Sequence, residues 1–279
     1  MANADRVVAP LILFIGVYVA TLFALALATP AAGQWIGLAS VAVATAVAVG
    51  AIERGRWPLG LFVRPVLILR EMLLGLAFGT VLVGGCAVLV ALSTPVTHGD
   101  GAGFPWSELL LVLIPAVLHE ELLFRGYAFQ KLLRWRRWPA LSGVALVFAL
   151  LHAGNPAASP LGLLNVLLGG LLLGVAYEVY ARLWLPIGFH GAWNVMVGPI
   201  TGHEVSGYVM QPTVLTVRGE GPAWLTGGDF GLEGSIFMTL CEVIALAVLL
   251  EIRRRRAAVT ASVAPDVGVR AENAVREHS

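Results

Sequence analysis

Three short groups of polar residues interrupt apolar stretches of this chain, and their side chains are of types that can move protons. The first runs from His119 to Arg125 with the sequence HEELLFR, the second ends at His152, and the third runs from His190 to Asn194. A carboxylate can accept a proton during a reaction, and imidazole and amide groups can donate hydrogen bonds to a developing negative charge. Ionisable groups are costly inside a membrane, so each group is a candidate functional site if its stretch crosses one.

The two adjacent glutamates of the first group should play different parts. Residues four apart share one face of a helix, whereas neighbours point about 100° apart. Glu121 and Arg125 can therefore pair with each other, which leaves Glu120 free to face a cavity. The structural alternative is an Arg–Glu pair that reaches toward the membrane interface, with Glu120 as a partly hydrated neighbour.

The other two groups are each open to a purely structural interpretation. His152 ends the pattern Phe148-x-x-x-His152 and, taken alone, could simply lie at a membrane interface. His190 and Asn194 share a helix face, so they point toward a cavity or toward a hydrogen-bonding partner on another helix. Three such groups in one chain are harder to explain by packing, and we interpret them as parts of one site.

The composition indicates that these groups lie in a membrane protein. Of the 279 residues, 58% are hydrophobic and 13% are charged, and the mean hydropathy is +0.84. Soluble domains have about 25% charged residues, so the composition excludes a soluble globular domain. Cys86 and Cys241 both lie in apolar runs, which argues against a disulfide framework and against a cysteine-based metal site.

We expect an all-α fold, namely a polytopic transmembrane bundle of about eight helices. Each apolar run is about long enough to cross a hydrocarbon core of roughly 30 Å. The predicted spans are 7–28, 35–52, 66–93, 107–133, 138–153, 161–181, 184–200 and 234–252. Gly169, Gly170 and Gly174 in the sixth span should permit the close approach of a neighbouring helix.

With eight spans, nearly all basic residues of the connecting segments fall on one side of the membrane. They follow spans 2, 4, 6 and 8: Arg54, Arg56, Arg64, Lys131, Arg134, Arg136, Arg137, Arg182, Arg253, Arg254, Arg255 and Arg256. The segments on the other side, 94–106, 154–160 and 201–233, contain a single Lys or Arg residue, which is Arg218. Because cytoplasmic loops are enriched in Lys and Arg, we expect both termini in the cytoplasm and a multi-pass protein of the cell membrane.

The predicted organisation has five parts. They are N-terminal transmembrane helices (1–106), a core with all three polar groups (107–200), an outer loop (201–233), a last transmembrane helix (234–256) and a disordered cytoplasmic tail (257–279). The Gly-rich outer loop could be an ordered cap or could be mobile. Glu178 and Arg182 are four apart near the inner end of the sixth span, and we expect them to pair.

Together the three groups resemble the motifs of the CPBP family. This family comprises type II CAAX-processing endopeptidases and the related bacterial bacteriocin-processing or self-immunity (Abi) proteins. Its motifs stand here complete and in the family's order, each on a separate predicted helix: Glu120-Glu121-x-x-x-Arg125, Phe148-x-x-x-His152 and His190-x-x-x-Asn194. The resemblance covers about residues 107–200, a third of the chain.

The resemblance implies an intramembrane endopeptidase that hydrolyses a peptide bond with a glutamate-activated water. Glu120 would be the general base, His152 would hold or activate the water, and His190 and Asn194 would stabilise the oxyanion. Three further residues would support the site by pairing or packing: Glu121, Arg125 and Phe148. The partners would be the lipid bilayer and a peptide or protein substrate at the membrane, with no nucleic acid.

The resemblance leaves the metal dependence open, because the family has been described as metalloproteases. Glu120, His152 and His190 could hold Zn²⁺ with an open fourth position. The helical zincin motif needs two histidines four apart around a glutamate, and Leu123 stands where the second would follow His119. We favour a metal-free mechanism and no cofactor, with zinc as the alternative.

Two other functions fit the same residues. The chain could be a non-catalytic membrane scaffold or a bacteriocin self-immunity protein, in which the polar groups are structural. It could also be a transporter that uses Glu120 and the histidines as a proton relay, although no inverted repeat is evident in the sequence.

Overall fold

The computed structural model describes residues 2–56 and 59–276, and it is predominantly helical. Its main helices are α1 (Ala2–Ala28), α2 (Gln34–Ala51), α3 (Pro65–Ser93), α5 (Ile114–Arg125), α6 (Tyr127–Trp135), α7 (Arg137–His152), α8 (Pro160–Tyr180), α9 (Trp184–Val195) and α11 (Ile236–Arg276). Short helical pieces are α4 (Trp106–Glu108), α10 (Ala223–Thr226), π-helical turns at Leu109–Leu113 and Met196–Ile200, and 3₁₀ turns at Pro30–Ala32, Gly228–Phe230 and Leu232–Gly234.

The eight apolar stretches predicted from the sequence are all helical in the structure. Within the described residues, four helices are long and apolar enough to cross a membrane: Arg6–Ala28, Gln34–Ala51, Pro65–Ser93 and Pro160–Tyr180. The helix α7 is also apolar but shorter. The fold is therefore that of a helical membrane protein.

The fourth predicted span, 107–133, is wrong as a single helix. The helix α5 ends at Arg125, and α6 begins after a break at Gly126. A Cβ atom on Gly126 would collide with the carbonyl oxygen of Leu122, so the chain can turn here because this residue is glycine. The break places the HEELLFR sequence at the very end of α5.

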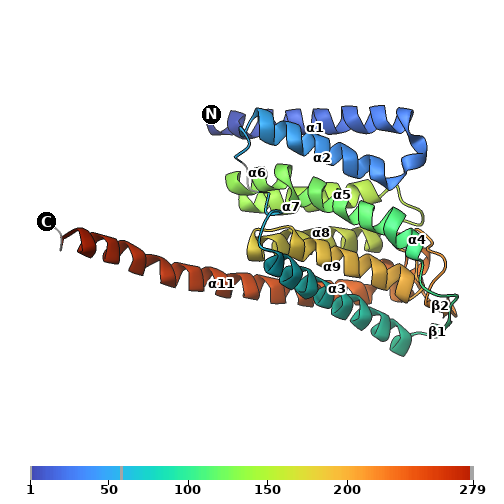
Figure 1. Cartoon of the computed structure of the whole chain (residues 1–279). Helices are drawn as coiled ribbons and strands as arrows, with labels where there is room; N and C mark the ends of the chain where they lie inside the picture. The colour runs from blue at the N-terminus through green and yellow to red at the C-terminus, as the bar shows by residue number, and fades with distance from the viewer. Residues whose placement is uncertain (1, 57–58, 277–279) are drawn as a thin grey trace.

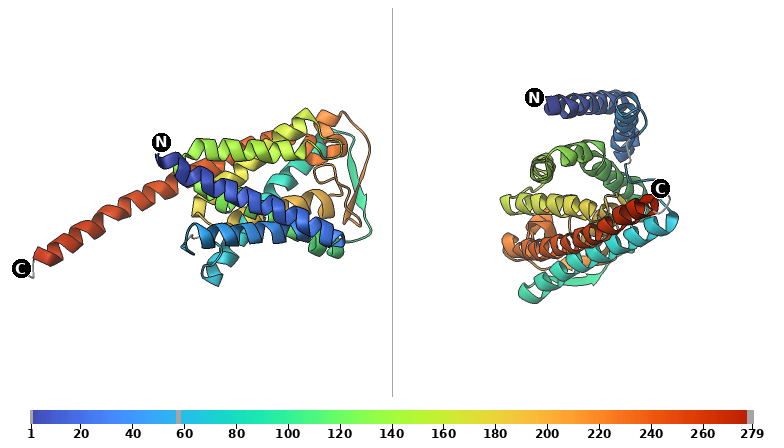
Figure 2. Two further views of the ribbon diagram at one scale, coloured as in Figure 1. Left: turned by 90° about the horizontal axis from the view of Figure 1, so that it is seen from above. Right: turned by 90° about the vertical axis from the view of Figure 1, so that its left-hand side faces the viewer.

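Helix α9 lies at the centre of the bundle and carries the third polar group. It packs against α3, α5 and α8, while α7 and α11 both pack against α8. The hairpin of α1 and α2 forms an outer layer that contacts α5, as both Figure 1 and Figure 2 show. The three helices that carry polar groups, α5, α7 and α9, therefore face one region of the bundle.

Small residues set the close helix contacts. A Cβ atom on Gly75 of α3 would collide with the carbonyl oxygen of Leu185 in α9. A Cβ atom on Gly170 of α8 would lie 3.1 Å from Ala145 of α7, and one on Gly174 would lie 2.8 Å from a side chain of the same helix. The predicted close packing at the glycines of the sixth span is confirmed at these two positions.

One small β-sheet departs from the predicted all-α fold. Strand β1 (Thr97–Asp100) pairs antiparallel with β2 (Leu215–Arg218), in a register that places Thr97 opposite Arg218. This pairing ties the chain after α3 to residues 201–235, which we call the cap. The structure therefore shows the outer loop as an ordered element between α9 and α11.

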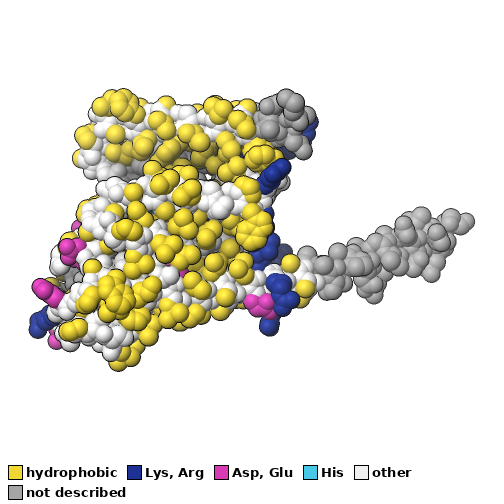
Figure 3. All heavy atoms as spheres, turned by 180° about the vertical axis from the view of Figure 1, so that it is seen from behind, with side chains coloured by type: hydrophobic (Ala, Val, Ile, Leu, Met, Phe, Trp, Pro, Cys, Tyr) yellow, Lys and Arg dark blue, Asp and Glu magenta, His cyan; other side chains and the backbone are white. Residues whose placement is uncertain are grey.

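The two ends of the bundle differ in charge. At one end, which we call the arginine end, Lys and Arg gather where α11 leaves the bundle, and Figure 3 shows a hydrophobic band between this end and the opposite one. Ion pairs join separate elements there, for example Lys131 with Glu53 at 2.6 Å and Arg137 with Glu178 at 2.7 Å. The opposite end, which holds β1, β2 and the cap, is the cap end (Figure 1).

The predicted pair of Glu178 with Arg182 is wrong. Glu178 pairs with Arg137 and with Arg253, and Arg182 instead pairs with Glu71 of α3. The reason is that α8 ends at Tyr180 and the next residue takes a left-handed conformation, so Arg182 leaves the face that Glu178 occupies.

Helix α11 extends far beyond the other helices at the arginine end (Figure 1). It runs without a break to Arg276, through residues for which the sequence predicts a disordered tail. Residues 277–279 of that tail lie outside the described residues, as do Met1 and residues 57–58 of the N-terminal part.

Candidate functional site

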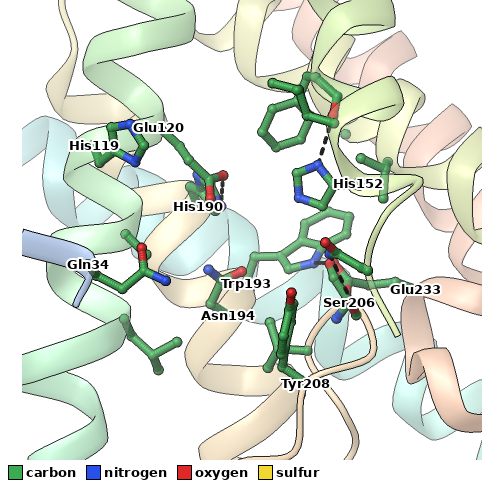
Figure 4. Close-up of a pocket in the computed structure, with 18 of the residues that line it drawn as sticks. Gln34, His119, Glu120, His152, His190, Trp193, Asn194, Ser206, Tyr208 and Glu233 are labelled. Atoms are coloured by element: carbon green, nitrogen blue, oxygen red, sulfur yellow. Dashed lines mark hydrogen bonds and ion pairs between the residues drawn. The ribbon is translucent and has the colours of Figure 1, made fainter. Parts of the chain in front are cut away.

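A cavity of ≈ 530 Å³ lies between α5, α7, α9 and the cap. Five of the seven predicted site residues line it, one or two from each helix: Glu120, Phe148, His152, His190 and Asn194. Figure 4 shows Glu120 beside His190 on one wall and the His152 ring on the opposite wall. The remaining two, Glu121 and Arg125, are buried behind the wall that α5 forms.

The two glutamates of α5 both reach His190. The Nδ1 atom of His190 lies 2.8 Å from Oε1 of Glu121, and its Nε2 atom lies 3.7 Å from Oε2 of Glu120. Glu121 is fully buried, whereas the side chain of Glu120 is 26% exposed to the cavity. The different parts expected for the two carboxylates therefore match their different surroundings.

Arg125 is the counter-charge of Glu121 and is itself fully buried. Its Nη1 donates to Glu121 over 3.1 Å, as the four-residue spacing predicts, and its Nη2 donates to the carbonyl oxygen of Gly170 over 3.0 Å. The guanidinium group lies 5.1 Å from the ring centre of Phe148. The arginine thus joins α5 to α7 and α8 directly behind the cavity.

Phe148 fills the space between the charged groups and the two histidines. Its ring centre lies 4.5 Å from that of His152 and 6.4 Å from that of His190. It also contacts Phe124 of α5 edge-on, with ring centres 5.0 Å apart. The predicted packing role of Phe148 agrees with these contacts.

The backbone of α7 fixes the orientation of His152. Its Nδ1 atom lies 2.8 Å from the carbonyl oxygen of Phe148. A carbonyl oxygen only accepts hydrogen bonds, so Nδ1 carries the proton, and Nε2 of the neutral ring keeps its lone pair. Figure 4 shows this side of the ring turned toward the cavity. His152 can therefore accept a hydrogen bond from a molecule in the cavity.

Asn194 follows His190 by one helical turn and lines the same cavity. Among the described residues its side chain has no hydrogen-bond partner in the protein, so both ends of the amide are available to a ligand. His119 also lines the cavity and contacts the hairpin: its Nε2 lies 2.9 Å from the hydroxyl of Tyr18, and its ring fills the space beside Gly37.

Glu233 of the cap is a buried carboxylate of the cavity wall that sequence reasoning missed. It accepts from Nε1 of Trp193 at 2.9 Å and from both the hydroxyl (2.8 Å) and the backbone N–H of Ser206. Burial raises the pKa of Glu233, and these donated hydrogen bonds oppose that effect. Glu233 lies 40 residues after Trp193, so no spacing in the sequence could have linked them.

Two polar residues of the apolar helices lie next to this cap contact. Asn165 of α8 donates to the carbonyl oxygens of Glu233 and Ser235, and so joins α8 to the cap. Glu242 of α11 is fully buried near Gly169, and neither of its carboxylate oxygens has a hydrogen-bond partner in the described part of the chain.

The sequence left a zinc site of Glu120, His152 and His190 as an alternative, and the metal dependence stays a prediction. Within residues 2–56 and 59–276, no group of three or more His, Cys, Asp or Glu side chains is arranged to hold a metal ion. In particular, the Nδ1 atom of His190 is engaged by Glu121, and its other nitrogen faces Glu120.

The arrangement brings a proton acceptor and hydrogen-bonding groups to one enclosed space. Glu120 presents a carboxylate, His152 presents a lone pair from the opposite wall, and Asn194 presents an amide between them (Figure 4). Water bound between Glu120 and His152 would be polarised from both sides. The addition of such a water to a carbonyl group is the chemistry that these groups can support.

One comparison with known proteins matches the segment that carries the three polar motifs. The model of the family described as Rce1-like type II CAAX prenyl endopeptidases matches residues 102–196, about a third of the chain. The matched segment contains all three polar motifs, which confirms the resemblance to the CPBP family. No curated protein and no solved structure matches the chain.

Proposed function

We propose that this chain is a multi-pass intramembrane endopeptidase of the cell membrane that hydrolyses a peptide bond of a membrane-associated protein or peptide. The observation that carries the proposal is the placement of Glu120 and His152 on opposite walls of one cavity, with His190 beside Glu120 and with Asn194 one helical turn after His190. The match of residues 102–196 to a protease family supports the same conclusion.

Glu120 is the general base of the proposed reaction. A water in the cavity gives a proton to the Glu120 carboxylate while its oxygen bonds to the carbonyl carbon of the substrate. The carbonyl oxygen becomes an oxyanion in the tetrahedral intermediate. Glu120 then passes the proton to the leaving nitrogen as the carbon–nitrogen bond breaks, which releases an amine and a carboxylic acid. His152 Nε2 accepts a hydrogen bond from the other O–H of the water, and this bond holds the water in line for attack.

His190 and Asn194 stabilise the oxyanion. Asn194 donates through its free amide group. In the doubly protonated form, His190 donates Nδ1–H to Glu121 and has Nε2–H available on the cavity side. Removal of one oxyanion donor typically costs about 10²–10³ in kcat. Glu121 acts through His190, and Arg125 acts through Glu121, so both are positioning residues.

Both termini lie in the cytoplasm in this proposal. The basic residues of the connecting segments gather at the arginine end, and cytoplasmic segments carry the excess of Lys and Arg. Eight crossings place the N-terminus and the end of the last span at that same end, as the helix directions in Figure 1 allow.

A peptide-cleavage assay tests the proposal. Wild type and Glu120→Ala are purified in detergent and incubated with a mixed library of membrane-associated peptides, with and without a metal chelator, and the products are identified by mass spectrometry. We expect cleavage by wild type alone, at the same rate with chelator. Product formed in ¹⁸O-labelled water should carry the label in its new carboxyl group, because water is the nucleophile.

The outcome separates the competing functions. If folded wild type and folded Glu120→Ala are both inactive on the library, the scaffold or self-immunity function is favoured over the peptidase. If the chelator stops cleavage and added Zn²⁺ restores it, the metal-free mechanism is wrong. Matching elution profiles and unfolding temperatures of the two proteins establish that a lost activity is not a lost fold.

A further inference from the structure

The cavity reaches only one end of the bundle. Apart from the helix walls, its rim is formed by the first residue of α2, Gln34, by Glu108 of α4, by Asn155 in the link between α7 and α8, and by Tyr208 and Val209 of the cap. All these segments lie at the cap end, and Figure 4 shows Gln34 and Tyr208 at the edge of the space that Glu120 and His152 enclose.

Toward the arginine end the cavity is closed by packed side chains. Behind Glu120 come Glu121 and Arg125, both with no exposed surface, and then the equally buried Tyr127 and Phe129 at the start of α6. None of the described residues that line the cavity is a lysine or an arginine, and none comes from α6 or from the links at the arginine end. A substrate therefore has no path to Glu120 from that end.

The charge of the two ends decides which side of the membrane the opening faces. The segments at the arginine end hold nearly all basic residues of the connecting segments, whereas those at the cap end hold only Arg218. Such a bias sets the orientation of membrane proteins, with the basic segments in the cytoplasm. We infer that the catalytic cavity opens to the extracytoplasmic side of the membrane.

This orientation limits the substrates to peptide segments on the extracytoplasmic side of the membrane. The cleaved bond belongs to an exported peptide, or to the outer juxtamembrane segment of a membrane-anchored protein. The prenylated C-terminal tail of a cytoplasmic protein, which the name of the matched family suggests, lies on the wrong side. The substrate class rests on the proposed peptidase function, but the side of the opening does not, and it can be measured without any cleavage.

Cysteine labelling tests the orientation. In a background with Cys86→Ala and Cys241→Ala, single cysteines are introduced as Val209→Cys at the cavity rim, Glu120→Cys inside the cavity and Phe62→Cys at the arginine end. Val209 and Phe62 are 69% and 96% exposed, respectively, so reagents can reach both positions. Each variant is expressed in bacteria. Intact and lysed spheroplasts are then treated in parallel with a membrane-impermeant maleimide.

We expect Val209→Cys and Glu120→Cys to be labelled in intact spheroplasts, and Phe62→Cys to be labelled only after lysis. The reverse pattern would overturn the inference, whatever the peptidase assay gives. If Glu120→Cys does not fold, Val209→Cys and Phe62→Cys still decide the orientation. Single-span reporters that carry a cleaved library sequence on the outer or the inner side then test the substrate class, and cleavage of the inner reporter alone would contradict it.

Discussion

Two buried carboxylates, Glu121 and Glu233, adjoin the same cavity but are stabilised in different ways. Glu121 is paired with Arg125 in its own helix and contacts His190. Glu233 lies in the cap and has only neutral donors, from Trp193 and Ser206. His190 and Trp193 both belong to α9, so this one helix links the charged pair in the bundle to the carboxylate of the cap.

The difference indicates that Glu121 stabilises the helix bundle, whereas Glu233 stabilises the cap. The Glu121 contact joins continuous helices, and its loss should weaken the whole bundle and misplace His190. The Glu233 contact joins a cap of turns and one short strand to α9, and its loss should loosen the cap while the bundle persists. The cap should thus be the less stable region, consistent with its position over the opening of the cavity.

The largest expected effect concerns the charged pair. Arg125→Met should lower the free energy of unfolding by about 3–5 kcal/mol, because it leaves the buried Glu121 carboxylate without a counter-charge. The double variant Glu121→Gln with Arg125→Met should recover part of this loss, since it removes both charges. Unfolding in detergent, followed by circular dichroism, measures wild type, the two single variants and the double variant. Strictly additive losses would show that the two side chains do not depend on each other.

A smaller and more local effect is expected in the cap. Glu233→Gln should destabilise the closed cap by about 2–3 kcal/mol, because hydrogen bonds to a charged group are replaced by weaker ones and one amide donor faces other donors. Hydrogen exchange should speed up at the Ser206 amide and in the rest of residues 201–235, with little change in α5. Glu204→Gln, the same change at a partly exposed cap position, is the control. Equal acceleration in both variants would refute the role of Glu233.

Acid should also act on the cap rather than on the bundle. Burial, followed by the nearby His98, lowers the pKa of His203 to about 4, whereas a free histidine has a pKa of about 6.5. Between these values the open cap binds more protons than the closed one, so its stability falls as the pH drops below about 6.5. At pH 5 the loss should reach about 2 kcal/mol relative to pH 7.5. Hydrogen exchange of the cap at the two pH values measures it, and His203→Gln should remove most of the difference. The remainder comes from His98, whose pKa is also lowered by burial, and from Glu233, whose raised pKa acts in the opposite direction. An undiminished pH response in His203→Gln would contradict the role of His203.

The sequence was most informative for contacts inside one helix that continues unbroken past both residues. Apolar length predicted the helices, and the four-residue spacing predicted the pair of Glu121 with Arg125. The motifs also predicted which side chains meet at one cavity, although their catalytic roles remain predictions. The break at Gly126 was not predictable from composition, because it depends on one backbone turn within a helical pattern.

Contacts between side chains that are far apart in the chain could not be predicted from the sequence. Trp193 meets Glu233 across 40 residues, and Tyr18 meets His119 across 101. The predicted pair of Glu178 with Arg182 failed for a similar reason, since each residue found a partner on another helix. Such pairings depend on how the helices pack. A hydrophobic pattern predicts where a helix lies, but it does not predict which polar side chain of another helix each polar residue will meet.

The most direct test of the account compares two carboxylates of the same cavity. Glu108 also lines it, but lies twelve residues before Glu120, about 18 Å away along the helix. With a peptide found in the library, Glu120→Gln should lower kcat by about 10²–10⁴-fold, because the general base is lost. Glu108→Gln should keep kcat within the same order of magnitude as wild type. Cleavage by Glu120→Gln at the wild-type rate, or an equal loss in both variants, would contradict the assignment of Glu120 as the base.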